Sequence, residues 1–459
     1  MSPPSMRRFC SLFILLAVAS ASAAEVTNLR CQRDSAPLGV DERNPRLSWQ
    51  LSGSKHDLKQ LAYQILVASS RDDLEKGKLA WDTGKVASHQ SIHVPYAGHE
   101  LDSRGQYFWK VRVWTNQQDE PLESPVARWE MGLLNRSDWT ASWISAPRVH
   151  VWKSFIADRR ARWQEEGIGE PRQTDPAPYL RKDFEVDREV AEARVYVTGL
   201  GYYELFLNGR KVGDHVLDPA FTRYDERVLY EVYDLTEELG AGTNVLAANV
   251  GDGWYNMHSL ATWGFDKAVW RQPPTLLCQL EITYSDGTRE TVVSDDSWLS
   301  HPSPTVFTSI RQGETYDAGK EIKDWATAKA NLAAWIPARE VPGPAGLLRC
   351  QTMPPIRVTA ELKPVKITEP KPGVYVVDFG RNIAGRVKIS LTVTKKGAKL
   401  TLKHAEKLDK DGLCDQSELV RHMRQSRFEL DDYVCSGRPS ETWHPRFTYH
   451  GFQYVEVHG

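Results

Sequence analysis

Hydrophobic and polar residues alternate with a period of two along most of the chain. The clearest runs are Tyr107–Trp114, Tyr63–Ala68 and Tyr203–Leu207. Successive side chains of a β-strand point to opposite faces, so this alternation predicts strands with one buried face. Asn208-Gly209 and Asp286-Gly287 carry the residue types that favour tight hairpin turns. The pattern therefore predicts an all-β protein built from sandwich domains.

Helical periodicity is confined to a few segments. Residues 153–166 are rich in Arg and Glu and lie in a polar stretch, which predicts an inserted helix or a mobile loop. Residues 417–429 and 325–335 are two further short helical candidates. All three segments are minor interruptions of a strand-rich chain.

Three blocks follow from the spacing of strands and turn residues. Residues 25–135 contain seven or so short strands at the spacing of an immunoglobulin or fibronectin type III sandwich. A second block, residues 136–350, ends in the Pro- and Gly-rich stretch 341–344, and a third block covers residues 351–459. We expect three consecutive sandwich domains.

The first 24 residues have the composition of a secretory signal peptide. Arg7 and Arg8 precede a short apolar run at 9–19, and the small residues 21–23 form a cleavage site. A membrane anchor is the competing interpretation, but the run falls short of the roughly 20 apolar residues that a membrane span needs. We therefore expect an exported protein, periplasmic, surface-bound or extracellular, without a membrane span.

Net charge argues against nucleic acid as a partner, and cysteine spacing argues against a zinc site built from cysteines. The formal net charge is −2, which gives no electrostatic basis for binding nucleic acid. Five cysteines remain after the predicted leader, and none are spaced as the CxxC pairs of zinc sites. Export would permit a disulfide, and Cys414 with Cys435 is a conceivable pair.

Several acidic and histidine positions are candidates for chemistry. Asp295-Asp296 and Asp431-Asp432 are neighbouring acids, but adjacent strand residues face opposite ways, so neither pair forms a ready dyad. We expect all four in solvated turns or on the surface. His404 and Glu406 stand two apart on a predicted strand and should share a face, as a metal or acid–base site or, favoured here, as a cross-strand polar pair.

Longer motifs resemble the bacterial α-L-rhamnosidases, in the same order along nearly the whole mature chain. The matching segments are residues 38–41 with 44–49, 81–86, 202–214, 217–219, 251–255, 313–318, 378–385, 404–406 and 447–457. The resemblance implies that the second block is that family's N-terminal β-domain, with a jelly-roll-like sandwich. It implies that the third block is the family's concanavalin-like sandwich.

The resemblance also implies a chemistry. The family's enzymes are inverting glycosidases that remove terminal L-rhamnose, and inversion needs two carboxyl groups roughly 6.5–9.5 Å apart. In the family these carboxylates lie on an (α/α)6 helical barrel, downstream of the segment matching residues 447–457 here. No catalytic residue is therefore carried over to this chain. We expect the non-catalytic N-terminal portion of an exported α-L-rhamnosidase, without hydrolase activity of its own.

Two alternatives remain open. The chain is either a stand-alone carbohydrate-binding protein, or a truncated or split gene product that serves a separate (α/α)6 catalytic chain. In the second case the face that meets the barrel should be apolar and exposed, with Phe447, Tyr449 and Phe452 as candidates.

The loop that follows residue 250 is the candidate sugar-binding site. Some rhamnosidases bind rhamnose on the middle β-domain through a calcium ion, so the resemblance raises calcium as a cofactor, with no ligands assigned. Oxygen ligands and aromatic faces suit such a site. The candidate residues are Asp252, Trp254, Tyr255, Asn256 and Trp263. Packing of Trp254 and Tyr255 in the core or between domains is the competing and favoured interpretation.

Overall fold

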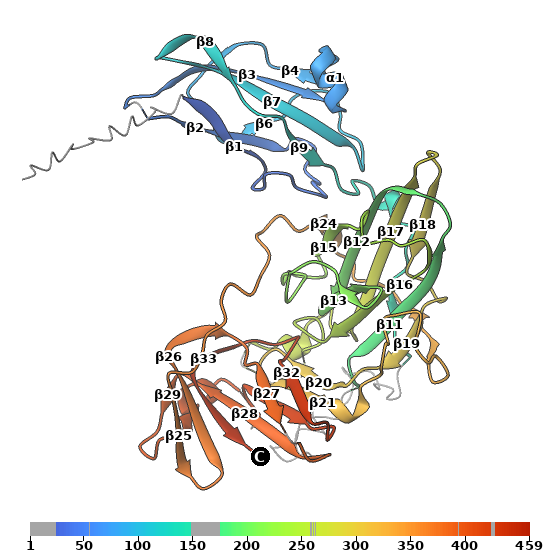
Figure 1. Ribbon diagram of the computed structural model, residues 1–459, viewed down its shortest axis with the longest axis vertical. Coiled ribbons are helices and arrows are strands. Elements are labelled where there is room, and N and C mark those ends of the chain that lie inside the picture. The colour runs from blue at the N-terminus through green and yellow to red at the C-terminus, as the bar shows by residue number, and fades with distance from the viewer. Residues whose placement is uncertain are drawn as a thin grey trace, which may run out of the picture. The chain divides into compact units, whose positions relative to one another are not determined.

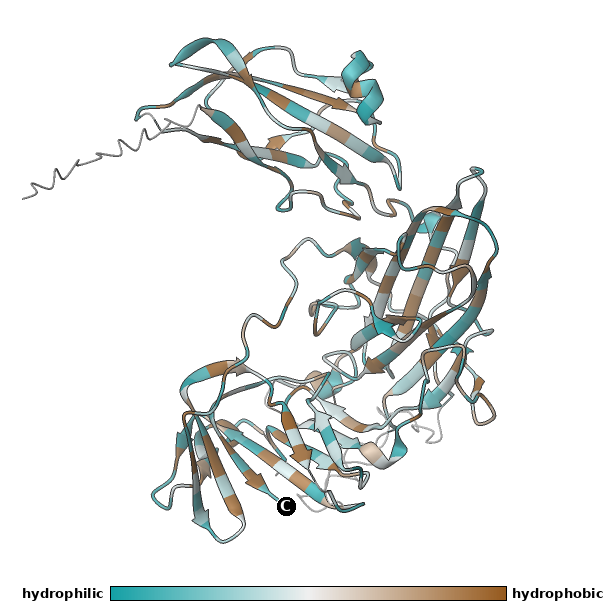
Figure 2. Cartoon of the chain, in the orientation of Figure 1, coloured by the Kyte–Doolittle hydropathy of each residue, from teal (hydrophilic) through white to brown (hydrophobic). Residues whose placement is uncertain are grey.

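The structure is a computed structural model that describes residues 24–459 except 55, 148–174, 258, 260, 262, 393 and 424–426. The chain divides into two compact units, Met1–Met131 and Gly132–Gly459. Strands dominate the described residues, and apolar and polar residues alternate along them (Figure 2), so the all-β prediction is confirmed.

The first unit is a sandwich of two sheets (Figure 1). One sheet has the order β1 (Glu25–Cys31), β2 (Arg46–Ser52), β6 (Val94–Pro95). The other has the order β4 (Trp81–Asp82), β3 (Gln60–Ala68), β7 (Gln106–Thr115), β8 (Gln118–Glu123), with β5 (Val86–Ala87) paired to β3 and β9 (Ala127–Glu130) paired to β7. Every second residue of β7 is buried, as its alternation predicts.

The core of this unit is rich in tryptophan. Trp49, Trp109 and Trp129 are fully buried between the two sheets. A short helix, α1 (Arg71–Lys76), follows β3 and buries Leu74 against it. Ser70 caps this helix by accepting a hydrogen bond from the Asp73 backbone N–H at 3.0 Å.

The second unit begins with a large sandwich. Its first sheet has the order β23 (Arg339–Glu340), β10 (Ile144–Ser145), β17 (Thr275–Tyr284), β12 (Val190–Leu200), β15 (Arg227–Asp234), β24 (Leu347–Cys350), with β18 (Arg289–Val293) paired to β17. Its second sheet has the order β14 (Arg210–Lys211), β13 (Tyr202–Leu207), β16 (Gly242–Gly251), β11 (Pro178–Val186), β19 (Leu299–Pro302), β22 (Ile336–Pro337). Val195 and Val197 of one sheet pack with Leu205 and Leu246 of the other in one apolar core.

The C-terminal sandwich of this unit takes two strands from the middle of the chain. Its main sheet has the order β20 (Thr305–Ser309), β21 (Gly313–Asp317), β31 (Leu430–Val434), β28 (Lys399–Ala405), β33 (His450–His458), β26 (Val374–Gly385), β25 (Lys366–Lys371). Two further pairs are β27 (Ile389–Thr392) with β32 (Ser440–Trp443) and β29 (Lys407–Leu408) with β30 (Cys414–Asp415). β21 runs parallel to β31. The β20–β21 hairpin thus lies in sequence within residues 136–350 but in space within the C-terminal sheet.

The remaining elements are short. They are η1 (Arg136–Asp138), η2 (Phe265–Lys267), η3 (Ala318–Lys320) and α3 (Ser417–Val420). In the part of the chain that the structure describes, no helix has the length and apolar character needed to cross a bilayer.

The helix predicted over residues 325–335 is wrong, because this segment forms turns. Its Trp325 ring stacks on Tyr179 at 3.7 Å between centroids and meets Phe206 edge-on. The segment covers the outer side of the β11–β16–β13 sheet, and this packing overrides the local helical pattern. Over residues 417–429, only Ser417–Val420 are helical. The candidate at 153–166 lies outside the described residues.

The conceivable Cys414–Cys435 disulfide is also wrong. Both cysteines are free and buried, as are Cys31, Cys278 and Cys350. Burial raises the pKa of the Cys414 thiol to about 12, so this group is an unreactive apolar filler.

Candidate functional site

The predicted sugar-binding loop follows β16 and is anchored by a buried polar network. The two carboxylate oxygens of Asp252 accept hydrogen bonds from the Asn256 amide at 2.6 Å and from the Thr308 hydroxyl at 2.7 Å. Thr308 in turn accepts from the Asp252 backbone N–H at 2.9 Å. Asp252 is 5% exposed and Asn256 8% exposed. This network ties the loop to β20.

The aromatic residues of the loop divide between core and surface. Tyr255 is fully buried and packs edge-on against Tyr224, with ring centroids 5.3 Å apart. Trp254 is half-buried and packs against Phe221 and Phe265. Core packing, the favoured interpretation in the sequence, accounts for both positions.

Trp263 differs from the other aromatic residues because 53% of it is exposed. The Arg311 guanidinium lies 4.2 Å from the centroid of its ring, in cation–π contact. His422 lies beside the same ring, at 5.7 Å between centroids. Of the five candidate residues, Trp263 thus presents the most surface to a ligand.

Asp252, the acidic residue of the predicted sugar-binding loop, is already engaged within the fold. Calcium takes roughly six to eight oxygen ligands, and both Asp252 oxygens already serve as acceptors within the fold. Among the described residues, two groups of histidine and carboxylate side chains lie close enough to share an ion, and Asp252 belongs to neither. Sugar binding and a calcium requirement therefore stay predictions.

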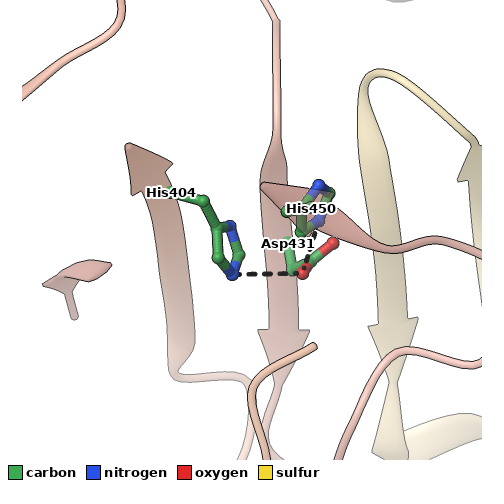
Figure 3. A group of neighbouring side chains, drawn as sticks. All are labelled: His404, Asp431 and His450. Carbon is green, nitrogen blue, oxygen red and sulfur yellow. Dashed lines mark hydrogen bonds and ion pairs between the residues drawn. The ribbon is translucent and has the colours of Figure 1, made fainter. Parts of the chain in front are cut away.

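One of these two groups is a buried constellation whose members are far apart in the sequence (Figure 3). His404 lies on β28, Asp431 on β31 and His450 at the start of β33, and all three side chains are 0% exposed. The Asp431 carboxylate oxygen Oδ2 is 3.0 Å from His450 Nε2 and 3.8 Å from His404 Nε2. Three neighbouring strands of one sheet therefore converge on one carboxylate.

The expectation that Asp431 and Asp432 are solvated is wrong. Asp432 is 3% exposed and pairs with Arg427 at 2.6 Å, on the opposite face from Asp431. The two acids face opposite ways, as strand geometry requires. For Asp295 and Asp296 the turn interpretation holds, because Asp295 accepts from the Ser297 backbone at 3.0 Å just after β18.

His404 and Glu406 do not share a face, contrary to expectation. β28 ends at Ala405, and Glu406 is exposed in the bend that leads to β29. The His404 side chain instead points inward, like that of the buried Leu402 two residues earlier. Its polar neighbour is Asp431 on the adjacent strand β31. His404 could have been identified because it is a polar residue at a position where the alternation of the strand predicts a buried apolar side chain.

Burial and ion pairing set the charges of the three groups. Burial and the neighbouring His450 lower the pKa of His404 to about 3, so its imidazole is neutral. Burial alone would lower the pKa of His450, but the Asp431 carboxylate raises it above the ordinary value. Burial would raise the pKa of Asp431, and His450 lowers it. With no ion bound, His450 and Asp431 therefore form an ion pair beside a neutral imidazole.

The predicted apolar docking face is wrong in two of its three residues. Phe447 packs beneath Gly251 in the junction between the two sandwiches of the second unit, and Phe452 belongs to the C-terminal core. Tyr449 is 41% exposed. Exposed apolar side chains occur instead along the segment before and into β25, at Met353, Ile356, Val358, Val365 and Ile367.

Sequence models of three domain families match the chain in order. They are the Rha78A-like N-terminal immunoglobulin domain over residues 26–135, the α-L-rhamnosidase N-terminal domain over 188–360, and the bacterial α-L-rhamnosidase concanavalin-like domain over 368–459. An α-L-rhamnosidase of Formosa agariphila is 35% identical over 97% of this chain and 48% of its own length.

Solved structures agree with this match. The α-L-rhamnosidase of Dictyoglumus thermophilum superposes with a TM-score of 0.83 at 36% identity, over 95% of this chain and 47% of that one. The Streptomyces avermitilis α-L-rhamnosidase, solved in complex with L-rhamnose, superposes with a TM-score of 0.83 at 29% identity, over 95% and 56%. The chain thus spans about half the length of the relatives it matches. It carries the immunoglobulin-like, N-terminal and concanavalin-like β-domains of the bacterial α-L-rhamnosidase family.

Proposed function

We propose that this chain is the non-catalytic β-domain portion of an exported α-L-rhamnosidase and that it does not by itself hydrolyse rhamnosides. The main support is that the matched half of its relatives consists of these β-domains. No α-helix in the described residues is longer than six residues. These residues therefore form no helical barrel that could hold a general acid and a general base around a water molecule.

Release of p-nitrophenol from p-nitrophenyl α-L-rhamnoside tests this proposal. The purified chain should release none above the buffer rate, while a full-length rhamnosidase of the Formosa type gives a positive control. Hydrolysis by the chain would contradict the proposal. If a separate (α/α)6 chain is the natural partner, adding it should restore hydrolysis. For export, the mature protein recovered outside the cytoplasm should begin at Glu25, which N-terminal sequencing reads directly.

A second candidate function, carbohydrate binding on the middle domain, is supported by Trp263. Its exposed ring lies beside Arg311, and sugars stack their apolar faces on such rings. Calorimetry with L-rhamnose, with and without a calcium chelator, should show binding that W263A abolishes. V269A is the matched control, because Val269 is 82% exposed near the same loop. If wild type and W263A give equal heats of binding with L-rhamnose, Trp263 does not contribute to sugar binding.

A further inference from the structure

The constellation of His404, Asp431 and His450 contains an electrostatic conflict. His404 Nδ1 donates to the backbone carbonyl oxygen of Glu429 at 3.0 Å, and a carbonyl can only accept, so Nδ1 carries the proton. His404 Nε2 then bears a lone pair. This atom is buried, has no hydrogen-bond partner among the described residues, and faces the Asp431 Oδ2 atom 3.8 Å away.

Two acceptors that face one another in a dry core are costly. An unsatisfied buried acceptor costs about 1–3 kcal/mol, and the carboxylate beside it adds repulsion. A cation between Nε2 and Oδ2 would satisfy both atoms. The aim of the His404 ring toward Asp431 is plain in Figure 3.

The distances suit a small metal ion. Zinc bonds of roughly 2.0–2.2 Å place tetrahedral ligand atoms about 3.4 Å apart. The Oδ2 atom of Asp431 lies 3.0 Å from His450 Nε2 and 3.8 Å from His404 Nε2, on either side of that value. Candidate ligand atoms of all three residues lie within 4.8 Å of one another.

Two of the three side chains are held by the backbone through the atom that faces away from the centre, whereas His450 Nδ1 has no hydrogen-bond partner among the described residues. The Glu314 backbone N–H donates to Asp431 Oδ1 at 2.8 Å, and the Glu429 carbonyl fixes His404 through Nδ1. Metal-ligating histidines and carboxylates are typically oriented by such outer hydrogen bonds. Two imidazole nitrogens and one carboxylate favour zinc and its neighbours over calcium or magnesium.

We propose that His404, Asp431 and His450 form a buried structural site for a divalent transition-metal ion of the zinc type. Full burial of all three side chains indicates a structural ion rather than a catalytic one. The ion would join β28, β31 and β33, which carry much of the C-terminal sheet. The competing arrangement is the metal-free ion pair of His450 with Asp431.

The second group of potential ligands provides a matched control. His215 donates or accepts through both ring nitrogens, at 2.8 Å to Asp218 and 2.9 Å to Arg357, so it has no lone pair left for an ion. H215Q should therefore leave metal binding unchanged, whereas H404Q should abolish it.

Metal content of the full chain tests the proposal. Protein purified without a histidine tag, stripped with dipicolinate and reloaded with zinc should retain about one zinc per chain after desalting, measured by plasma mass spectrometry. Zinc should raise the melting temperature of stripped wild type and H215Q, and leave that of H404Q unchanged. Cobalt should give visible d–d absorption in wild type and H215Q and none in H404Q.

If H404Q does not fold, the zinc content and melting temperature of wild type alone decide the test. Wild type that retains under a tenth of an equivalent of zinc and shows no zinc-dependent shift in melting temperature overturns the proposal. So does folded H404Q that keeps the full equivalent. Retained zinc in wild type and H215Q, with loss in H404Q, supports it.

Discussion

Glu441 is a single carboxylate that organises the turn after β31. It is 3% exposed and accepts hydrogen bonds from the Tyr433 hydroxyl at 2.6 Å and from the backbone N–H groups of Ser436 and Gly437 at 3.0 Å each. Thr394 donates to it as well. Burial by itself would raise the pKa of Glu441, but these hydrogen bonds lower it to about 2.

We expect E441Q to lower the free energy of unfolding by about 2 kcal/mol at pH 7, because hydrogen bonds to a charge are lost. Since the folded pKa lies below the ordinary 4.5, this stabilisation is complete above pH 4.5 and fades as the pH falls toward 2. Urea unfolding at pH 7 and pH 3 measures the difference. E340Q, on an exposed edge strand, is the control. A penalty that grows as the pH falls would contradict this assignment.

For a single residue, the sequence predicts the face of the strand to which its side chain points, but not the residues that this side chain contacts. Alternation along β28, had it been followed, would have placed both Leu402 and His404 in the interior. The meeting of His404 with Asp431 and His450 depends on the strand order β31, β28, β33, and residue spacing does not encode that order. The same lack of tertiary information led to the wrong prediction of a solvated Asp431.

Among the elements, strands were predictable and short helices were not. The hairpin turn at Asn208-Gly209 is confirmed, with φ values of 51° and 84° that suit Asn and Gly. The 325–335 segment failed because Trp325 and Ala326 gain more by covering a sheet than by forming a helical turn. The helix α1 was not anticipated, although Ser70 with Asp73 is a capping signal that the sequence offered.

Helix α1 depends on its cap because it spans only six residues. We expect S70A to lower the stability of the first unit by about 1 kcal/mol, since the Asp73 N–H loses its partner. S70T keeps the hydroxyl and should recover most of the loss. Thermal unfolding of the three proteins, followed by tryptophan fluorescence, makes the comparison. Equal melting temperatures for S70A and wild type would show that the cap contributes nothing.

Within the second unit the two sandwiches are joined by buried polar and apolar contacts. Glu204 on β13 pairs with Arg446 of the C-terminal sandwich at 2.5 Å, and the Glu204 side chain is 6% exposed. Burial would raise the pKa of Glu204, but Arg446 lowers it. Beside this pair, an added Cβ on Gly251 would lie 2.4 Å from the Phe447 ring, so only glycine fits the junction.

We expect E204Q to destabilise the second unit by about 2 kcal/mol, because the half-buried Arg446 charge loses its carboxylate partner. E361Q breaks the exposed Lys388–Glu361 pair and should change stability by less than about 1 kcal/mol. Urea unfolding of each variant checks both values. Equally small effects of E204Q and E361Q would contradict a stabilising role of the Glu204–Arg446 pair.

The β20–β21 hairpin has a consequence for how such genes can recombine. An exchange of coding sequence between residues 318 and 366 would give the incoming C-terminal sandwich its edge strand β20 and the neighbouring strand β21 from a foreign parent. The foreign β21 would then have to pair with β31 in the same parallel register, in which Thr315 lies opposite Asp432. The two sandwiches are therefore best regarded as a single heritable module, and productive crossovers in this family should fall ahead of Gly132.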